Sequence, residues 1–348
     1  MTSVGIVANP ASGTDIRRLV AHGTPLDNGE KANIVRRVLL GLESVGVEQA
    51  WIMPEFYGIG RRALDGLSIK MPVYLFPMRV SFSQEDSMRA ADLMVAKGVG
   101  CIVTIGGDGT NRVVAKASRE VPLMAISTGT NNVFPNMIEG TIAGMAAGLA
   151  ARGLVNSAVH QMPRLEIFHG QDSKDFRGST SLETRPPSDI ALVDATVYDE
   201  RFVASRAIWD VSKILELFLT RSEPGNIGLS AIGAHLPREN LVGFDESLSS
   251  YGNGLYLRMS PEGKEVTAPI APGLIRRVHV AESRIIQPGD LLTVNTKRPC
   301  VLALDGEREI QLRSDSCVRI RMSSEGPKIV CAQQAMEVAA REGIFVRN

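Results

Sequence analysis

The chain has 348 residues, of which 44% are apolar and 22% are charged, as in ordinary globular proteins, and this length predicts about two domains. Lysine plus arginine and aspartate plus glutamate both number 38, so the basic excess expected of a sequence-independent nucleic-acid binder is missing. The sequence shows no secretory signal, and its longest small-apolar run, 142–151, is shorter than the roughly 20 residues of a membrane span. The four cysteines form no CxxC pair. We therefore expect a cytoplasmic protein that binds neither nucleic acid nor membranes.

The first part of the chain alternates apolar strands with helices. Strands are predicted at 4–8, 73–76, 101–105 and 123–126, and helices at 33–42, 88–95 and 110–116. Strands and helices that alternate at this spacing form a parallel sheet, in which ligands bind beyond the carboxyl ends of the strands. Three polar loops that contain glycine, 9–13, 106–110 and 127–132, each follow such a strand. We therefore expect these loops to line a ligand site.

The second part of the chain, after a helix predicted at 141–151, has a different pattern. Short β-like runs bounded by Gly, Pro, Asp or Ser occur at 164–168, 190–197, 254–259, 274–280, 291–293, 300–304, 309–312 and 318–322. This spacing is typical of an antiparallel sandwich or barrel. Helices are also predicted at Phe202–Leu219 and 332–341, and the polar stretch 170–188 is predicted to be an exposed loop that could also serve as a lid.

The predicted fold class is therefore α/β plus all-β. A Rossmann-like parallel α/β domain at 1–134 precedes an antiparallel β-sandwich-like domain at 135–331. The C-terminal helix, within 332–348, is expected to pack back on the first domain.

The strongest chemical signal is the segment from Gly106 to Thr110, Gly-Gly-Asp-Gly-Thr. Its glycines allow a sharp turn and a close approach of the backbone to a ligand. The helix that follows would direct N–H groups and a positive dipole end at a phosphate. The carboxylate of Asp108 would be electrostatically unfavourable among N–H groups that only bind phosphate. We therefore interpret Asp108 as a proton acceptor or a Mg²⁺ contact. An ordinary Asp-Gly turn is the alternative.

Three other segments are weaker when each is taken alone. Asn9–Gly13 could be a simple turn, and Thr128–Asn132 again places glycine and small donors after a strand. Asp305-Gly306-Glu307 lies between two β-like runs, where a type I′ hairpin turn is the alternative interpretation.

Together, these four segments resemble the superfamily of NAD kinases, diacylglycerol kinases and sphingosine kinases. The likeness covers most of the chain in order: an NPxSG-like loop, GGDGT, a GTxN loop and a late DGE. With residues 26–31 and the helix after them included, the pattern is most similar to the ATP-NAD kinase-like, or acetoin-catabolism X, branch. The resemblance implies ATP with Mg²⁺ as phosphoryl donor, a site between the two domains, and a homo-oligomer, either a dimer or a tetramer.

The resemblance also implies a role for each matching residue. Asp108 would be the general base for a hydroxyl acceptor, Asn132 and Asp194 would contact that acceptor, and Asp305 and Glu307 would lie near phosphate and metal. Mg²⁺ would arrive with ATP, without a dedicated protein site. The residues expected to bind the nucleotide are Asn9, Ser12, Gly13, Gly106, Gly107, Gly109, Thr110, Asn111, Thr128, Gly129, Thr130 and Asn131.

One departure from the NAD kinase pattern leaves the acceptor open. Where those enzymes carry an Asn-acidic pair that holds the nucleoside of NAD, this chain has Val193 and Asp194. A lost polar contact of this kind costs about 1–3 kcal/mol. Three functions are therefore weighed: an NAD kinase that makes NADP, a kinase of another small hydroxyl metabolite or lipid, and a nucleotide-binding regulator without turnover. The combination of Asp108, Asp305 and Glu307 favours a kinase over a regulator.

Overall fold

The structure is a computed structural model that describes residues 1–13, 22, 26–170, 185–201, 208, 210–237, 239, 241 and 252–346. The chain divides into two compact units, which are described one at a time. The α/β unit comprises Met1–Thr14, Thr24–Met162 and Pro327–Asn348, and the β unit comprises Asp15–Gly23 and Pro163–Gly326.

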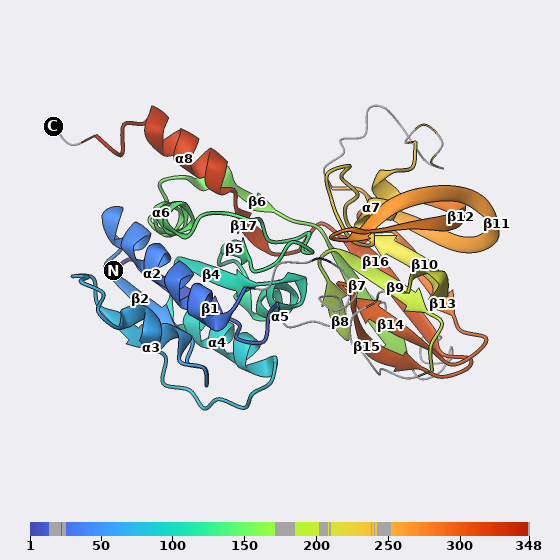
Figure 1. Cartoon of the computed structure of the whole chain (residues 1–348), viewed down its shortest axis with the longest axis horizontal. Coiled ribbons are helices and arrows are strands. Elements are labelled where there is room, and N and C mark those ends of the chain that lie inside the picture. The colour runs from blue at the N-terminus through green and yellow to red at the C-terminus, as the bar shows by residue number, and fades with distance from the viewer. Residues whose placement is uncertain are drawn as a thin grey trace. The chain divides into compact units, whose positions relative to one another are not determined.

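The α/β unit is built on a seven-stranded sheet in the order β3-β2-β1-β4-β5-β17-β6 (Figure 1). All neighbouring strands are parallel except β17 and β6, which are antiparallel. The strands are β1 (Ser3–Ala8), β2 (Gln49–Ile52), β3 (Val73–Leu75), β4 (Cys101–Gly106), β5 (Leu123–Ser127), β6 (Val159–Gln161) and β17 (Lys328–Val330). The strands β1, β4 and β5 are buried along their whole length, as expected of a sheet covered on both faces.

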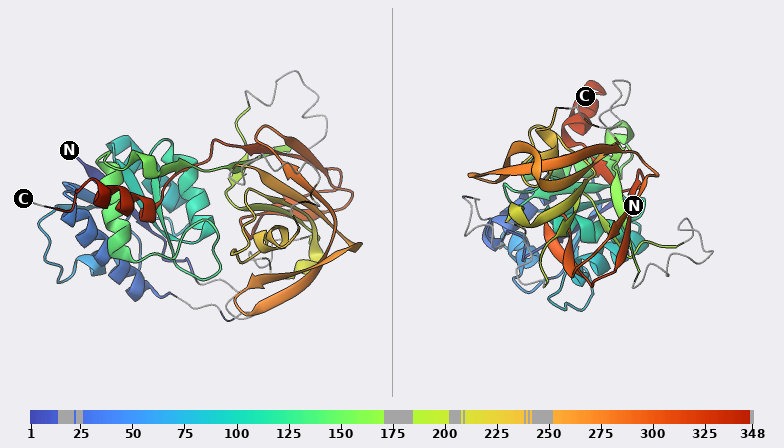
Figure 2. Two further views of the ribbon diagram at one scale, coloured as in Figure 1. Left: turned by 90° about the horizontal axis from the view of Figure 1, so that it is seen from above. Right: turned by 90° about the vertical axis from the view of Figure 1, so that its right-hand side faces the viewer.

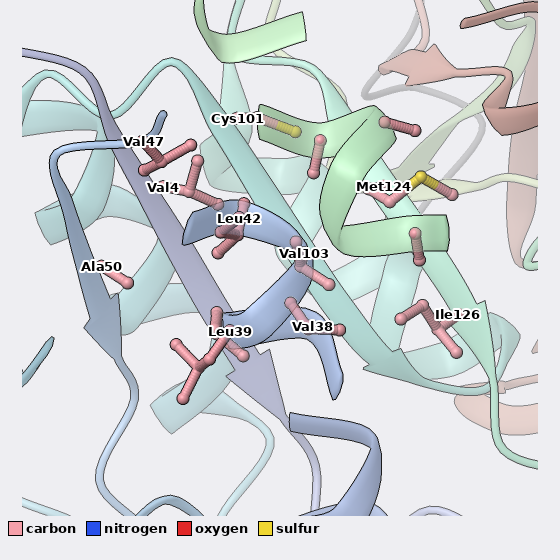
Figure 3. Close-up of a cluster of buried hydrophobic side chains, with 14 of the residues drawn as sticks. Val4, Val38, Leu39, Leu42, Val47, Ala50, Cys101, Val103, Met124 and Ile126 are labelled. Atoms are coloured by element: carbon pink, nitrogen blue, oxygen red, sulfur yellow. The ribbon is translucent and has the colours of Figure 1, made fainter. Parts of the chain in front are cut away.

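Helices cover both faces of this sheet. On one face lie α2 (Asn28–Ser44), α3 (Ile59–Leu64), α6 (Gly140–Ala151) and α8 (Ala332–Arg341), and on the other lie α4 (Glu85–Lys97) and α5 (Asp108–Ser118). Successive residues of β1 serve the two cores, because Ile6 packs with the first set and Val7 with the second. Figure 3 shows the first core, where Leu39 and Leu42 of α2 lie near Val4 of β1 and Val103 of β4.

The α/β unit extends beyond residue 134, where the sequence placed the domain boundary. Helix α6 belongs to this unit because it packs closely on α2: a Cβ atom at Gly144 would lie 2.3 Å from the Val38 carbonyl oxygen. Strand β6 belongs to it because it pairs with β17, close to the C-terminal end of the chain. Helix α8, red in Figure 2, lies against the green α6. The two three-residue strands at 159–161 and 328–330 were not predicted from the sequence.

The β unit consists of two antiparallel sheets. The larger has the order β12-β11-β10-β9-β14-β15, and the smaller has the order β13-β16-β7-β8. The strands are β7 (Arg164–Gly170), β8 (Asp189–Ala191), β9 (Asp194–Tyr198), β10 (Ile214–Leu219), β11 (Gly254–Ala271), β12 (Leu274–Ile286), β13 (Leu291–Asn295), β14 (Cys300–Leu304), β15 (Glu307–Leu312) and β16 (Cys317–Ser323). The short helix α7 (Ser230–Ala234) packs against β11.

One buried cluster joins the two sheets face to face. It contains Ile167 and Ile320 from the smaller sheet and Val197 and Leu302 from the larger sheet. Two antiparallel sheets with a shared core form a sandwich. The predicted fold class, a parallel α/β unit with an antiparallel β-sandwich-like unit, is thus confirmed.

The helix predicted at Phe202–Leu219 is wrong in its second half. A single 3-10 turn at Val211–Lys213 leads into the strand β10, which pairs with β9 and β11 on its two sides. The run Ile-Leu-Glu-Leu-Phe-Leu is almost wholly apolar, so its periodicity does not separate a helix from a central strand, and pairing with distant segments decides. Residues 202–207 and 209 of this prediction, and 171–184 of the predicted loop, lie outside the described residues.

Among the helices in the described ranges, none is long and apolar enough to cross a membrane.

Candidate phosphate-binding and catalytic site

Three loops meet at the carboxyl edge of the α/β sheet, beyond the neighbouring strands β1, β4 and β5. Loop 9–13 follows β1, residues 107–110 lead from β4 into α5, and loop 128–132 follows β5. The strand order reverses between β1 and β4, and ligands of open α/β sheets bind at such a switch point. The predicted grouping of the three loops agrees with this topology.

A side-chain hydrogen bond joins the first two loops. Asn9 Nδ2 donates to Thr110 Oγ1 over 2.8 Å, and the Asn9 backbone N–H donates to the Ile105 carbonyl over 3.0 Å. Asn9 Oδ1 also accepts from the backbone N–H of Ala11 over 2.9 Å, which holds the turn closed. Asn9 is therefore used to shape the loop and attach it to the start of α5.

The glycines at the β4–α5 junction are required by close packing. A Cβ atom at Gly106 would lie 2.5 Å from Thr110 Oγ1, and one at Gly107 would lie 2.7 Å from Asn132 Oδ1. The third loop is also bonded to this junction, since the Thr128 backbone N–H donates to the Gly106 carbonyl over 3.3 Å. A larger residue at Gly106 would clash with Thr110 of α5, and one at Gly107 would press on Asn132 of the third loop.

Asp108 is the first residue of α5, and its carboxylate is held by the two residues that follow the third loop. Its Oδ1 accepts from the backbone N–H groups of Val133 over 3.0 Å and Phe134 over 2.7 Å. A negative charge in the first helical turn is stabilised by the helix dipole. The N–H groups of that same turn have no acceptor within the helix, which makes the helix start a suitable place for phosphate oxygens.

The third loop is braced by its own side chains. Asn132 Nδ2 donates to Ser127 Oγ over 2.8 Å, and Ser127 Oγ in turn donates to the Gly129 carbonyl over 2.7 Å. Within the described part of the chain, the buried Thr128 Oγ1 has no hydrogen-bond partner. A buried hydroxyl is costly unless a partner satisfies it, so a ligand or water oxygen fits here. The predicted contacts Thr130 and Asn131 belong to the more exposed part of this loop.

Asn111 differs from the prediction that it contacts the nucleotide. Its side chain is fully buried. Its Oδ1 accepts from Thr104 Oγ1 over 2.6 Å, and its Nδ2 donates to the Gly107 carbonyl over 2.9 Å. Asn111 therefore holds α5 against β4 from beneath the loop.

Sequence reasoning assigned no role to Lys31, which the structure places under the first loop. Lys31 is only 1% exposed, and its ammonium group donates to carbonyl oxygens of Asn9, Pro10 and Ser12 over 3.0, 3.1 and 2.8 Å. It also donates to Asn28 Oδ1 over 3.0 Å. Its position within the 26–31 segment of the family pattern could have indicated a role. A lysine in a helix is otherwise expected on the solvated face.

In the β unit, Asp305 and Gly306 form the turn between β14 and β15. Both have positive φ, 52° and 73°, which matches the type I′ hairpin weighed from the sequence. The Asp305 carboxylate is buried, and its Oδ1 accepts from the consecutive backbone N–H groups of Leu192, Val193 and Asp194 over 2.9, 2.7 and 3.3 Å. Asp305 therefore anchors the β8–β9 junction, whereas Glu307 begins β15 and is half-buried.

The two residues that stand where NAD kinases carry the Asn-acidic pair are both buried. Val193 is 1% exposed and Asp194 is 4% exposed, and Asp194 Oδ1 accepts from Thr196 Oγ1 over 3.0 Å. The Val193 carbonyl accepts from the Thr220 backbone N–H over 2.9 Å. The isopropyl group of Val193 is thus buried and apolar. It offers none of the polar contacts that an asparagine would make to a nucleoside.

Neither a metal cluster among the described residues nor the thiols of Cys101 and Cys300 add to the site. Within the described ranges, no group of three or more His, Cys, Asp or Glu side chains is placed to hold a metal ion. Burial raises the pKa of the Cys101 thiol to about 12 and that of Cys300 to about 11, so both stay protonated at neutral pH.

Each half of the chain matches a known protein family. Residues 4–154 match the family described as the ATP-NAD kinase N-terminal domain, and residues 180–325 match the acetoin catabolism protein X C-terminal domain. Acetoin catabolism protein X of Cupriavidus necator (strain H16) is 34% identical over 355 residues, which cover 98% of this chain and 93% of the relative. A solved NAD kinase from Archaeoglobus fulgidus, in complex with ATP, aligns over 86% of this chain and 99% of its own, with 16% identity and a TM-score of 0.42.

Proposed function

Because the chain belongs to the acetoin catabolism protein X family, whose N-terminal half is an ATP-NAD kinase domain, we propose that it is an ATP-dependent phosphotransferase with a hydroxyl acceptor. The observation that carries this proposal is the placement of Asp108. It is a carboxylate at the start of a helix, inside a set of loops whose glycines and N–H groups suit phosphate.

Phosphoryl transfer needs mainly positioning and charge neutralisation. In the proposed reaction, the acceptor hydroxyl attacks the terminal phosphorus of ATP, the bond to the bridging oxygen breaks, and ADP leaves. Asp108 takes the hydroxyl proton. Loops 9–13, 107–110 and 128–132 hold the phosphates of the donor, and Mg²⁺ bound with ATP neutralises their charge.

We propose NAD as the first acceptor to test, with phosphorylation of its 2′-hydroxyl to give NADP. The match of residues 4–154 to ATP-NAD kinases supports it. A second candidate is another small hydroxyl metabolite, and the buried Val193 favours it because an apolar packing group offers no contact to a nucleoside. Acetoin and its reduced diol are suitable members of a test panel, given the name of the C. necator relative.

The purified protein is incubated with Mg²⁺, ATP and NAD, and NADP is measured with a coupled dehydrogenase. Formation of NADP by the wild type and not by Asp108→Asn supports the NAD kinase proposal. If NADP is absent, ADP release is followed with each compound of the panel. Acceptor-dependent ADP release that needs Asp108 supports the second candidate, and its absence with every acceptor contradicts the phosphotransferase proposal.

A further inference from the structure

We infer that Lys31 is a positioning residue that holds the first phosphate loop, 9–13, in the conformation that binds the donor. This inference rests on the proposed function for its kinetic consequence. Its structural content, a tethered ammonium that organises a loop, is independent of the reaction.

The surroundings of the Lys31 ammonium group resemble a monovalent cation site. Three backbone carbonyl oxygens and one amide oxygen lie within 2.8–3.1 Å of Nζ. The carbonyls come from Asn9, Pro10 and Ser12, so the loop is wrapped around the charge. An ammonium group removed from water is stable only when oxygens of this kind surround it.

The Ser12 carbonyl that faces Lys31 fixes the direction of the N–H group that follows it. The other two carbonyls do not, because Pro10 has no N–H and the Ala11 N–H donates to Asn9 Oδ1. A trans peptide unit is planar, so the N–H of each following residue points away from the carbonyl that precedes it. Because the Ser12 carbonyl points at Lys31, the Gly13 N–H points away from it. Gly13 has a φ of 76°, which glycine adopts without strain. Lys31 thus directs one N–H donor of the loop away from the buried ammonium group, as an anion site requires.

The effect of Lys31 reaches the β4–α5 junction through Asn9. The Asn9 carbonyl accepts from Lys31 Nζ, from Ser12 Oγ over 2.8 Å and from the Ser12 backbone N–H over 3.4 Å. The Asn9 side chain donates to Thr110, in the helical turn that begins at Asp108. Loss of the ammonium therefore loosens the loop and its connection to α5 together.

The test replaces Lys31 by methionine, an apolar side chain of similar length. Arg36→Met is the matched control, because Arg36 is a cation of the same helix that donates to the carbonyls of Arg62, Ala63 and Asp65. We expect Lys31→Met to raise KM for ATP by about tenfold or more with kcat changed by less than about threefold. Arg36→Met should leave both values near those of the wild type. Equal KM values for wild type and Lys31→Met, or equal increases in both variants, would overturn the inference.

Chemical rescue gives a second readout that general instability does not mimic. Lys31→Ala lacks only the propylammonium part of the side chain, so added n-propylammonium should restore the affinity for ATP. Tetramethylammonium at the same ionic strength is too large for the space between the four oxygens around Nζ, so it should not restore the affinity. Rescue by both cations alike, or by neither, contradicts a specific cation site.

Hydrogen–deuterium exchange separates this inference from the proposed function. Without any nucleotide, Lys31→Met should speed exchange in residues 9–13 and at the start of α5, whereas Arg36→Met should speed it near residues 62–66. Unchanged exchange at 9–13 in Lys31→Met overturns the inference. If the wild type binds no ATP but residues 9–13 exchange faster in Lys31→Met, the positioning role of Lys31 is supported and the proposed function is contradicted.

Discussion

Asp108 Oδ1 accepts a hydrogen bond of 2.7 Å from the backbone N–H of Phe134. The residue that begins α5 is thereby tied to the segment that follows β5, and the carboxylate has a fixed direction within the α/β unit. Preorganisation of this kind removes the need to orient a base after the substrate binds.

Asp108→Asn is expected to lower kcat by about 100-fold to 10,000-fold, because an amide cannot take the acceptor proton. Its oxygen can still accept from Val133 and Phe134, so the loop should keep its shape. Affinity for ATP, measured by calorimetry, should stay within about threefold of wild type. A variant that loses ATP binding but keeps its turnover at saturation would show that Asp108 is not the base.

Gly107→Ala is expected to raise KM for ATP by about tenfold or more, since its Cβ would lie 2.7 Å from Asn132 Oδ1 and push two loops apart. Gly225→Ala is the matched control, because nothing lies within 4 Å of its Cβ position. Steady-state kinetics of both variants provide the measurement. Similar KM values in the two variants would mean that the third loop moves without consequence.

Asp305→Asn is expected to lower the free energy of unfolding of the β unit by about 1–2 kcal/mol, measured by urea denaturation. Asparagine tolerates the positive φ, but it loses the charge that three backbone N–H groups share. Asp315 also has a positive φ, of 61°, and it is exposed, so Asp315→Asn should change stability by much less. Equal losses would assign the role of Asp305 to turn geometry alone.

Val193→Asn is expected to destabilise the protein by about 1–3 kcal/mol without lowering KM for NAD, because the polar amide would be buried. Val193→Ala removes the same apolar contacts without adding a polar group, so the pair separates packing from recognition. A KM for NAD that falls in Val193→Asn but not in Val193→Ala would place this position in the acceptor site.

The sequence predicted the loop residues of the α/β unit better than the buried residues that hold these loops in place. Asn9 directly follows β1, and Gly106 and Asp108 lie at the β4–α5 junction, so local patterns were enough to place them at one sheet edge. Lys31 was not assigned a role because its partners are carbonyl oxygens, and every residue has one. Asn111 was misassigned because a motif does not reveal which of its side chains point into the protein.

Elements that depend on distant partners were the hardest to predict. Residues 214–219 form a strand because β9 and β11 pair with them, not because of their own periodicity. The strands β6 and β17 have three residues each, which is too short for a recognisable pattern. They pair with each other although the β unit, 163–326, lies between them in the sequence. Their existence moved the boundary of the α/β unit away from residue 134.

The position of β17 has a consequence for biosynthesis. Until the ribosome has made residues 328–330, β5 lacks its partner at Leu123, although Asn136 already bonds to its other end, and β6 lacks the strand with which it pairs. The α/β unit emerges first but can only finish folding last, after the whole β unit has left the exit tunnel. A nascent chain halted near residue 300 would therefore present the Leu123 end of β5 and an unpaired β6, and open strand edges are surfaces that chaperones recognise and through which unprotected strands aggregate.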